Sequence, residues 1–288
     1  MTQAAGGPRA ATKRLLLGGV NAIGRSLGRV PRGRTAHILT YHQVRRTRAE
    51  ILDPYNEVTL ERLTAHVAAL QAAGLRLVTV SDLWARLQAG EDPQRLVALT
   101  FDDGLVEHDE IVAPVLQRVQ AAATFYIPSA CLGRTADEVG YQGLHMDAGG
   151  LGRLVAAGME IGSHSRSHPV LVRLQAAGLA EQVSGSRQDL EELLGQPPRT
   201  FSYPYGSRRT FDDRVVAAVR TAGYETAVST IPGGNWAGTP PYALRRIAVY
   251  QSDDETLVVA KAKGGLDWTG SLQEIWLRLF PHHSVRSG

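Results

Sequence analysis

Short apolar segments alternate with amphipathic segments from residue 36 onward. The apolar segments have the length of strands, which we predict at residues 36–41, 75–80, 96–101, 122–127, 159–162, 200–203, 225–229 and 246–250. Apolar residues recur at helical spacing between them, over residues 59–73, 83–87, 109–120, 149–157, 171–194, 211–222 and 255–263. Such regular alternation predicts an α/β fold with a mostly parallel sheet, either open or closed into a barrel.

No internal linker divides this pattern, so we predict a single domain over residues 36–263. A basic arm (residues 1–35) precedes it, and a C-terminal extension of unknown use (residues 264–288) follows it. In the arm, apolar residues from Leu16 to Val30 have helical spacing and are flanked by lysine and arginine, as in a helix that lies on an anionic membrane surface. Several glycines weaken this helix, so a docked or unstructured extension and a cleaved signal peptide are the alternatives.

Composition narrows the class of protein. With 43% apolar and 20% charged residues, the 288-residue chain can form an ordinary hydrophobic core. The single cysteine, Cys131, excludes an intramolecular disulfide, and no apolar run is long enough to span a membrane. The net charge of +3 comes from seven basic residues before residue 37; the rest of the chain is mildly acidic, which argues against a nucleic-acid-binding domain.

Chemically reactive residues follow four of the predicted strands, at the end of a βα sheet where active sites form. The four motifs are Tyr41-His42, Asp102-Asp103-Gly104, His164-Ser-Arg-Ser-His168 and Tyr203-Pro-Tyr205-Gly206. Two imidazoles four residues apart and one carboxylate can hold a divalent metal with a position left for water. Taken singly, the motifs also fit an ordinary turn, two unrelated histidines and an aromatic turn.

The motifs together resemble the polysaccharide deacetylases (NodB homology domain, carbohydrate esterase family 4). The resemblance covers residues 36–250 and rests on the order of Thr100-Phe-Asp-Asp-Gly104, Ala123-Thr-Phe125, His164-Ser-x-x-His168 and Tyr203-Pro-Tyr-Gly206. It implies a distorted (β/α) barrel that binds a divalent metal, usually zinc, and removes N-acetyl groups from a polysaccharide. By the same resemblance Asp103, His164 and His168 hold the metal, Asp102 is the general base, and the Tyr205 backbone N–H stabilises the oxyanion.

Two departures from the family pattern affect the other roles. Ser202 stands where the family usually has an arginine that holds the catalytic aspartate, and the late Leu-x-His motif that supplies the general acid is missing. The early Tyr41-His42 is similar to the strand end of the exopolysaccharide subgroup, the poly-β-1,6-N-acetylglucosamine deacetylases, which makes His42 the candidate acid. Arg245 or Arg246 could replace the missing arginine. Tyr203, Trp236 and Arg246 are our candidate substrate-binding residues.

The resulting hypothesis is an N-deacetylase that acts on N-acetylglucosamine units of an exopolysaccharide or its precursor. Alternatives are an amidohydrolase for peptidoglycan, chitin oligomers or cyclic imides, and a non-catalytic carbohydrate-binding assembly protein. The expected location is the cytoplasm or the membrane periphery, through contact of the basic arm, and the sequence leaves secretion open.

Overall fold

Parallel strands form one curled sheet at the centre of the molecule. The computed structural model describes residues 35–135 and 143–267. The strand order is β10-β1-β5-β6-β7-β8-β9, with β4 paired to the first half of β5. The strands are β1 (His37–Tyr41), β2 (Gln43–Arg45), β3 (Glu57–Thr59), β4 (Arg76–Val78), β5 (Leu96–Phe101), β6 (Thr124–Ile127), β7 (Glu160–Ser163), β8 (Thr200–Ser202), β9 (Thr226–Val228) and β10 (Ile247–Ala248).

The two edges of this sheet come together. Leu244 forms a parallel bridge with Val228 of β9, and three residues later Ile247 of β10 pairs with Leu39 of β1. The segment that leads into β10 therefore links the two ends of the strand order. The result is the distorted (β/α) barrel that the family resemblance implies, in a single domain.

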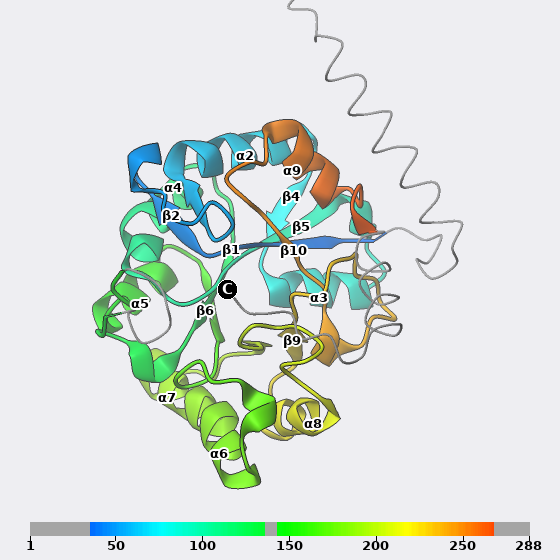
Figure 1. Cartoon of the computed structure of the whole chain (residues 1–288). Coiled ribbons are helices and arrows are strands. Elements are labelled where there is room, and N and C mark those ends of the chain that lie inside the picture. The colour runs from blue at the N-terminus through cyan, green and yellow to red at the C-terminus, as the bar shows by residue number, and fades with distance from the viewer. Residues whose placement is uncertain (1–34, 136–142, 268–288) are drawn as a thin grey trace, which may run out of the picture.

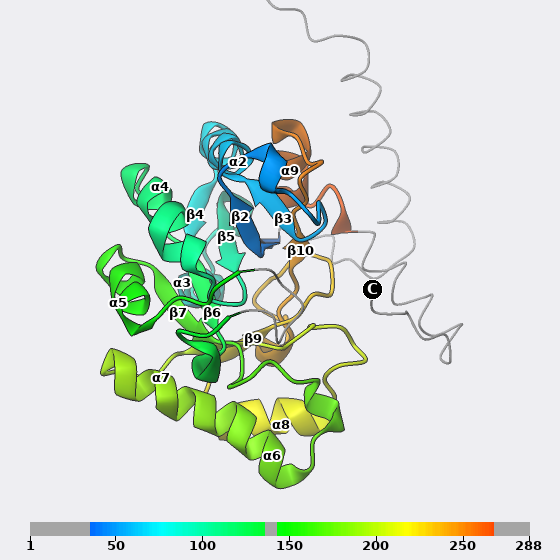
Figure 2. The same ribbon diagram turned by 60° about the vertical axis from the view of Figure 1, so that its left-hand side comes forward.

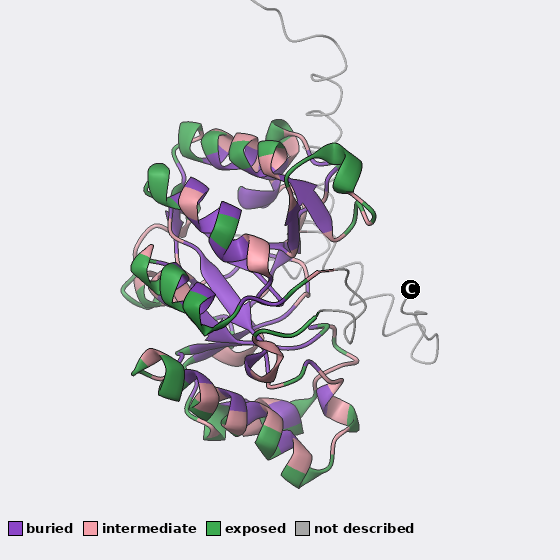
Figure 3. Cartoon of the chain, turned by 90° about the vertical axis from the view of Figure 1, so that its left-hand side faces the viewer, coloured by how far each residue is buried: buried purple, intermediate pink, exposed green. Residues whose placement is uncertain are grey.

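Helices surround the strands, as Figure 1 shows in a view into the ring. They are α2 (Leu60–Ala72), α3 (Val80–Gln88), α4 (Ala113–Arg118), α5 (Ala148–Ala156), α6 (Ala176–Ala180), α7 (Ser186–Leu194), α8 (Asp213–Thr221) and α9 (Glu255–Ala262). Figure 3 shows their exposed faces turned outward and the strands buried inside. The small parallel pair β2–β3 packs against α2 (Figure 2).

Burial explains why the strands were predictable. Every residue of β5 is buried, in the sequence Leu-Val-Ala-Leu-Thr-Phe. A parallel strand that is buried on both faces, by helices outside and by the barrel interior inside, needs an almost continuous apolar run. This is how the eight predicted strands stand out from the chain. Because all these strands are parallel, their carboxyl ends, and the motifs that follow them, share one edge of the sheet.

The helix predicted over residues 171–194 is interrupted in the structure. A 3₁₀ turn (Leu171–Arg173) comes first, and α6 and α7 are joined through a π-helical turn, Glu181–Gly185. The apolar spacing over residues 171–194 predicted one continuous helix and did not mark the π turn.

Residues 1–34 of the basic arm and residues 268–288 of the C-terminal extension lie outside the described residues. The predicted membrane contact and location therefore stay predictions. Within the described ranges, no helix has both the length and the hydropathy of a membrane-spanning segment.

Candidate metal and catalytic site

The four motifs meet at the carboxyl edge of the sheet. The Asp102 N–H donates to the main-chain oxygen of Tyr41 (3.1 Å), which joins the ends of β5 and β1. His164 Nδ1 donates to the main-chain oxygen of Ser202 (2.8 Å), which joins the ends of β7 and β8. Strand ends that are far apart in the sequence therefore form one site.

Backbone strain is concentrated at this site. Asp103, Ser165, His168 and Tyr205 have positive φ angles of 76°, 65°, 57° and 61°. In the described part of the chain the only other non-glycine residue with positive φ is Gln120. Each such conformation costs on the order of 1–2 kcal/mol, and backbone strain of this kind clusters at functional sites.

Asp103, His164 and His168 form a buried donor set. One donor atom from each lies within 4.8 Å of the others. Asp103 Oδ1 is 3.5 Å from Nε2 of His164 and 3.6 Å from Nε2 of His168. Nitrogen and oxygen donors about 2.0–2.2 Å from one tetrahedral zinc ion would be roughly 3.3–3.5 Å apart. The observed separations therefore fit a shared divalent cation.

The protonation of these residues also fits a metal. Because His164 Nδ1 donates to Ser202, its Nε2 keeps a free lone pair. Burial lowers the pKa of both His164 and His168 to about 4, against the opposing attraction of Asp102, so both are neutral at pH 7. Asp103 Oδ2 is buried and has no hydrogen-bond partner among the described residues. A buried carboxylate oxygen without a donor is costly unless a cation lies nearby.

Asp102 forms a buried ion pair with Arg246. Nη1 and Nη2 of Arg246 donate to Oδ1 and Oδ2 of Asp102, each over 2.7 Å. Burial raises the pKa of Asp102, but the attraction and hydrogen bonds of Arg246 outweigh it and keep that pKa well below the ordinary value. Asp102 is therefore ionised and held in one orientation.

The role of Arg246 corrects one prediction. Its remaining N–H groups donate to the main-chain oxygen of Ser229, to Thr100 Oγ1 and to Ser202 Oγ, so that all five donors have acceptors inside the protein. No donor remains for a substrate, and the expectation that Arg246 binds substrate is wrong. Arg246, rather than Arg245, occupies the place of the missing family arginine, and the small side chain of Ser202 lies beside it.

His42 lies at the rim of the site. It is half-buried and lies close enough to Asp102 and His168 to interact electrostatically with both. The Leu105 N–H donates to Nδ1 of His108 (3.2 Å), so His108 Nε2 carries the proton that it donates to the main-chain oxygen of His42 (2.7 Å). The main chain of the candidate acid is therefore hydrogen-bonded to His108, in the segment that follows Asp103.

Tyr205 contacts the donor set through the ring of His168. Its ring centroid is 4.8 Å from that of His168, and half of the residue is exposed. Among the described residues no acceptor is bonded to its N–H, which is therefore free to bind an oxyanion. The neighbouring Gly206 is required, since a Cβ there would lie 2.7 Å from the Thr230 nitrogen.

Two predicted substrate-binding aromatics lie elsewhere. Tyr203 is completely buried, stacks on Phe211 with ring centroids 4.1 Å apart, and donates its hydroxyl to Tyr242. It offers no face to a sugar. Trp236 follows Asn235, which pairs with Ala36 at the amino end of β1, on the opposite side of the barrel from Asp102. Both predictions are wrong, because a motif or an aromatic residue type does not show which way a side chain points.

Two histidines of the site were missed. The sequence does not single out His108 or His145, since neither has a histidine or carboxylate partner at a diagnostic spacing. His108 holds His42, and His145 Nδ1 donates to the main-chain oxygen of Asp103 (2.7 Å). The position of His108 five residues after Asp103 was the only local signal; His145 depends on a long-range contact.

Comparison with known proteins agrees with this geometry. Residues 89–227 match the model of the polysaccharide deacetylase family. YxkH of Bacillus subtilis (strain 168) is 24% identical over 67% of this chain and 65% of its own length, so the chain spans slightly less than two thirds of this relative.

Solved deacetylase structures share the fold. The deacetylase PplD of Streptococcus pyogenes, solved with acetate, superimposes with a TM-score of 0.69 at 20% identity over 79% of this chain and 98% of its own. IcaB of Ammonifex degensii gives a TM-score of 0.68 at 24% identity over 81% and 98%. We conclude that residues 89–227 are similar in sequence to the polysaccharide deacetylase family and that the described domain has the fold of these deacetylase structures.

Proposed function

We propose that this protein is a metal-dependent hydrolase that removes N-acetyl groups from N-acetylglucosamine units of an exopolysaccharide or its precursor. The observation that carries the proposal is the convergence of Asp103, His164 and His168 on one point beside the ionised Asp102. A bound divalent cation, most simply zinc, would polarise the amide carbonyl and make a water molecule more acidic. The buried donor set provides the place for it.

The chain's own residues supply the proton transfers. Asp102 accepts the proton of the attacking water, and Arg246 keeps its carboxylate aimed at the site throughout. The Tyr205 N–H donates to the oxyanion that forms as water adds to the amide carbon. His42 donates a proton to the departing nitrogen, because an amide nitrogen leaves poorly without one. The products are acetate and the free amine.

Two observations support this choice over the alternatives. Ser202 at the family's arginine position would favour a non-catalytic carbohydrate-binding protein if Asp102 had no cation beside it, but Arg246 forms that ion pair. The exopolysaccharide substrate rests on Tyr41-His42 at the end of β1, where His42 lies beside Asp102. Peptidoglycan, chitin oligomers and cyclic imides are the alternative substrates.

Acetate release from a substrate panel tests the proposal. The panel contains β-1,6- and β-1,4-linked N-acetylglucosamine oligomers, peptidoglycan fragments and a cyclic imide, each with zinc- or cobalt-loaded protein. We expect the β-1,6 oligomers to give the highest kcat/KM. Preference for β-1,4 oligomers, peptidoglycan or the imide would replace the proposed substrate.

The acid is tested on the preferred substrate. His42→Ala should lower kcat by about 10²–10⁴-fold, the usual contribution of general acid catalysis. The control is His37→Ala, which removes a histidine from the opposite end of β1 and should leave kcat within about twofold. Full activity of His42→Ala would assign the proton donor to another residue.

A further inference from the structure

The loop that carries the two histidine ligands needs external support. Between His164 and His168, Ser165 adopts the left-handed conformation, and His168 does so itself. Neither residue is glycine, so the loop does not adopt this shape on its own. Inside the loop, the His168 N–H donates to Ser165 Oγ (3.0 Å). The remaining contacts come from neighbouring elements.

Gln182 bonds the middle of the loop with a single side-chain amide. Its Oε1 accepts the N–H groups of Arg166 (3.1 Å) and Ser167 (3.0 Å). Its Nε2 donates to Ser167 Oγ (3.0 Å). Three hydrogen bonds therefore connect one helical side chain to Arg166 and Ser167, two of the three residues between the histidine ligands.

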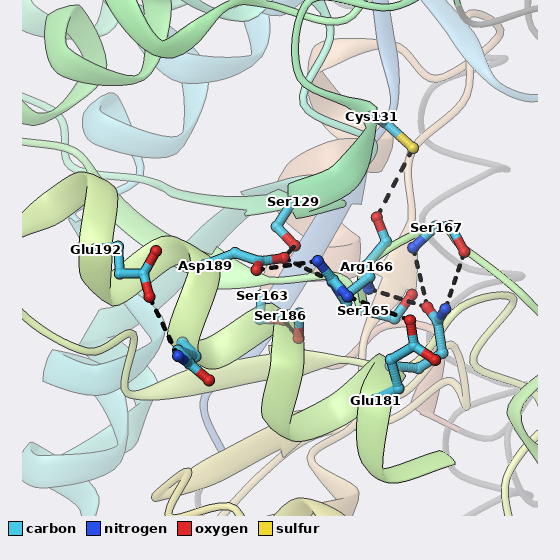
Figure 4. Close-up of polar contacts among 12 residues, drawn as sticks. Ser129, Cys131, Ser163, Ser165, Arg166, Ser167, Glu181, Ser186, Asp189 and Glu192 are labelled. Carbon is cyan, nitrogen blue, oxygen red and sulfur yellow. Dashed lines mark hydrogen bonds and ion pairs between the residues drawn. The ribbon is translucent and has the colours of Figure 1, made fainter. Parts of the chain in front are cut away.

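Arg166 extends the same connection to α7. Its Nε and Nη2 donate to Oδ2 and Oδ1 of Asp189 over 2.8 and 3.3 Å, as Figure 4 shows. Asp189 Oδ2 also accepts the Ser129 hydroxyl (2.6 Å), which comes from the loop after β6. In return, the Ser129 N–H donates to the main-chain oxygen of Ser165 (3.1 Å). Helix, β6 loop and ligand loop thus form one closed network.

The helix is shaped to fit this loop. The π turn Glu181–Gly185 contains both Gln182 and Gly185. A Cβ on Gly185 would lie 2.9 Å from Cδ of Arg166, so only glycine leaves room for the arginine. π turns inside α-helices are rare and occur often at functional sites. Here the irregular turn lies where the helix meets the ligand loop.

We propose that Gln182 and Asp189 are positioning residues that hold the 164–168 loop in its metal-binding conformation before the metal arrives. The inference rests on the proposed function, because it assumes that His164 and His168 bind the metal. Neither residue touches an imidazole. Their effect is to keep the two Nε2 atoms near Asp103, so that the loop does not have to be ordered when the metal binds.

Metal titration of the metal-free protein tests this role. Zn²⁺ affinity is measured by competition with a chromophoric chelator, and the visible absorption of bound Co²⁺ reports the donor geometry. Gln182→Ala should weaken Zn²⁺ binding about 10-fold, the lower end of the effect of removing outer-shell support from a metal site. It should also lower the intensity of the Co²⁺ bands. Asp189→Ala should weaken Zn²⁺ binding severalfold.

Two further variants separate positioning from folding. Gln182→Glu keeps an acceptor for both loop N–H groups and should restore most of the affinity. Gln188 lies on the same helix, where its amide donates to the exposed Glu192. The Gln188→Ala variant should therefore bind Zn²⁺ like the wild type. Circular dichroism of each metal-free variant shows whether the fold is kept.

The outcomes distinguish the two hypotheses. If the wild type binds Zn²⁺ and a folded Gln182→Ala variant binds it within twofold, the positioning role is overturned and the proposed function stands. If the wild type binds neither metal, the proposed function fails and the positioning role fails with it. The inference is supported if Gln182→Ala binds Zn²⁺ about tenfold more weakly, Gln182→Glu regains most of that affinity, and Gln188→Ala binds like the wild type.

Discussion

Asp102 and Asp103 are neighbours in the chain but have opposite surroundings. Asp102 accepts two hydrogen bonds from Arg246. Asp103 instead directs one oxygen to two imidazoles, and its other oxygen has no donor in the part of the chain that the structure describes. The backbone turns left-handed at Asp103 (φ 76°), so the two carboxylates face different partners. In the proposed site this would allow one carboxylate to act as base while its neighbour binds a cation.

The Arg246–Asp102 pair predicts a large effect of one substitution. Arg246→Met should lower the free energy of unfolding by about 3–5 kcal/mol, because it leaves a buried carboxylate without its partner. It should also reduce acetate release strongly, since burial then raises the pKa of Asp102 without the opposing attraction and hydrogen bonds of the guanidinium. Urea unfolding and kinetics measure the two effects.

Arg245→Met is the control for this substitution. Arg245 points toward Pro232, and the change should cost less than about 1 kcal/mol. Equal destabilisation by the two variants would contradict the assigned role of Arg246.

At the residue scale, the sequence predicted the residues that belong to strand-end motifs. It failed for residues whose role depends on the direction in which the side chain points. Asp102, Asp103, His164 and His168 follow strand ends and could be found from the chain alone. The choice between Arg245 and Arg246 depends on which side chain points inward, and the burial of Tyr203 depends on its stacking with Phe211. Such facts follow from tertiary packing, which a local pattern does not contain.

At the element scale, the strands were predicted well and the helix ends less so. Buried parallel strands have continuous apolar runs, whereas the π turn before α7 lies at a contact with the ligand loop that is distant in sequence. The close packing of β7 gives a testable consequence at this scale. Gly162 lies where a Cβ would approach the Tyr126 ring to 2.5 Å and Thr200 Cγ2 to 3.0 Å.

Gly162→Ala should therefore destabilise the protein by about 1–3 kcal/mol, as overpacking of a core does. Gly152→Ala is the matched control, because Gly152 lies in α5 with nothing within 4 Å of the added Cβ. Alanine is the better helix former, so this variant should be stabilised by up to about 1 kcal/mol. Thermal unfolding measures both changes. A neutral Gly162→Ala would show that the sheet relaxes more easily than its packing indicates.

At the scale of the whole molecule, buried neutral histidines make stability depend on pH. Burial lowers the pKa of His66, and it lowers that of His108 to about 4. Below pH 6.5 the unfolded chain binds protons at these sites that the folded chain does not. Stability should therefore fall as the pH drops from about 6.5 to 4, by roughly 3 kcal/mol for His108 alone.

The His108 contribution can be isolated by comparing unfolding curves of metal-free wild type and His108→Gln. The variant should be less stable than the wild type at pH 8, because it loses the hydrogen bonds of His108 to Leu105 and His42. Its free energy of unfolding should decline less than that of the wild type between pH 6.5 and 4. Curves that stay parallel over this range would contradict the assignment.

Metal binding should also stabilise the whole molecule. Free Zn²⁺ at a hundred times its dissociation constant adds about 2.7 kcal/mol to the free energy of unfolding, if the unfolded chain does not bind it. In a domain of this size the Tm should rise by roughly 5–10 °C. His168→Ala should remove most of this rise. An equal rise in that variant would place the binding site elsewhere.

The central claim is that these residues form a metal-dependent deacetylase centre, and acetate release tests it most directly. The measurement compares zinc-loaded wild type, the same protein after chelation, and zinc-loaded Asp102→Asn on N-acetylglucosamine oligomers. The account predicts release by the loaded wild type, loss on chelation with recovery when zinc is restored, and a fall of about 10²–10⁴-fold in Asp102→Asn, which removes the base and leaves the three metal ligands. No release from any oligomer by a protein with stoichiometric bound zinc, or undiminished release by Asp102→Asn, would contradict it.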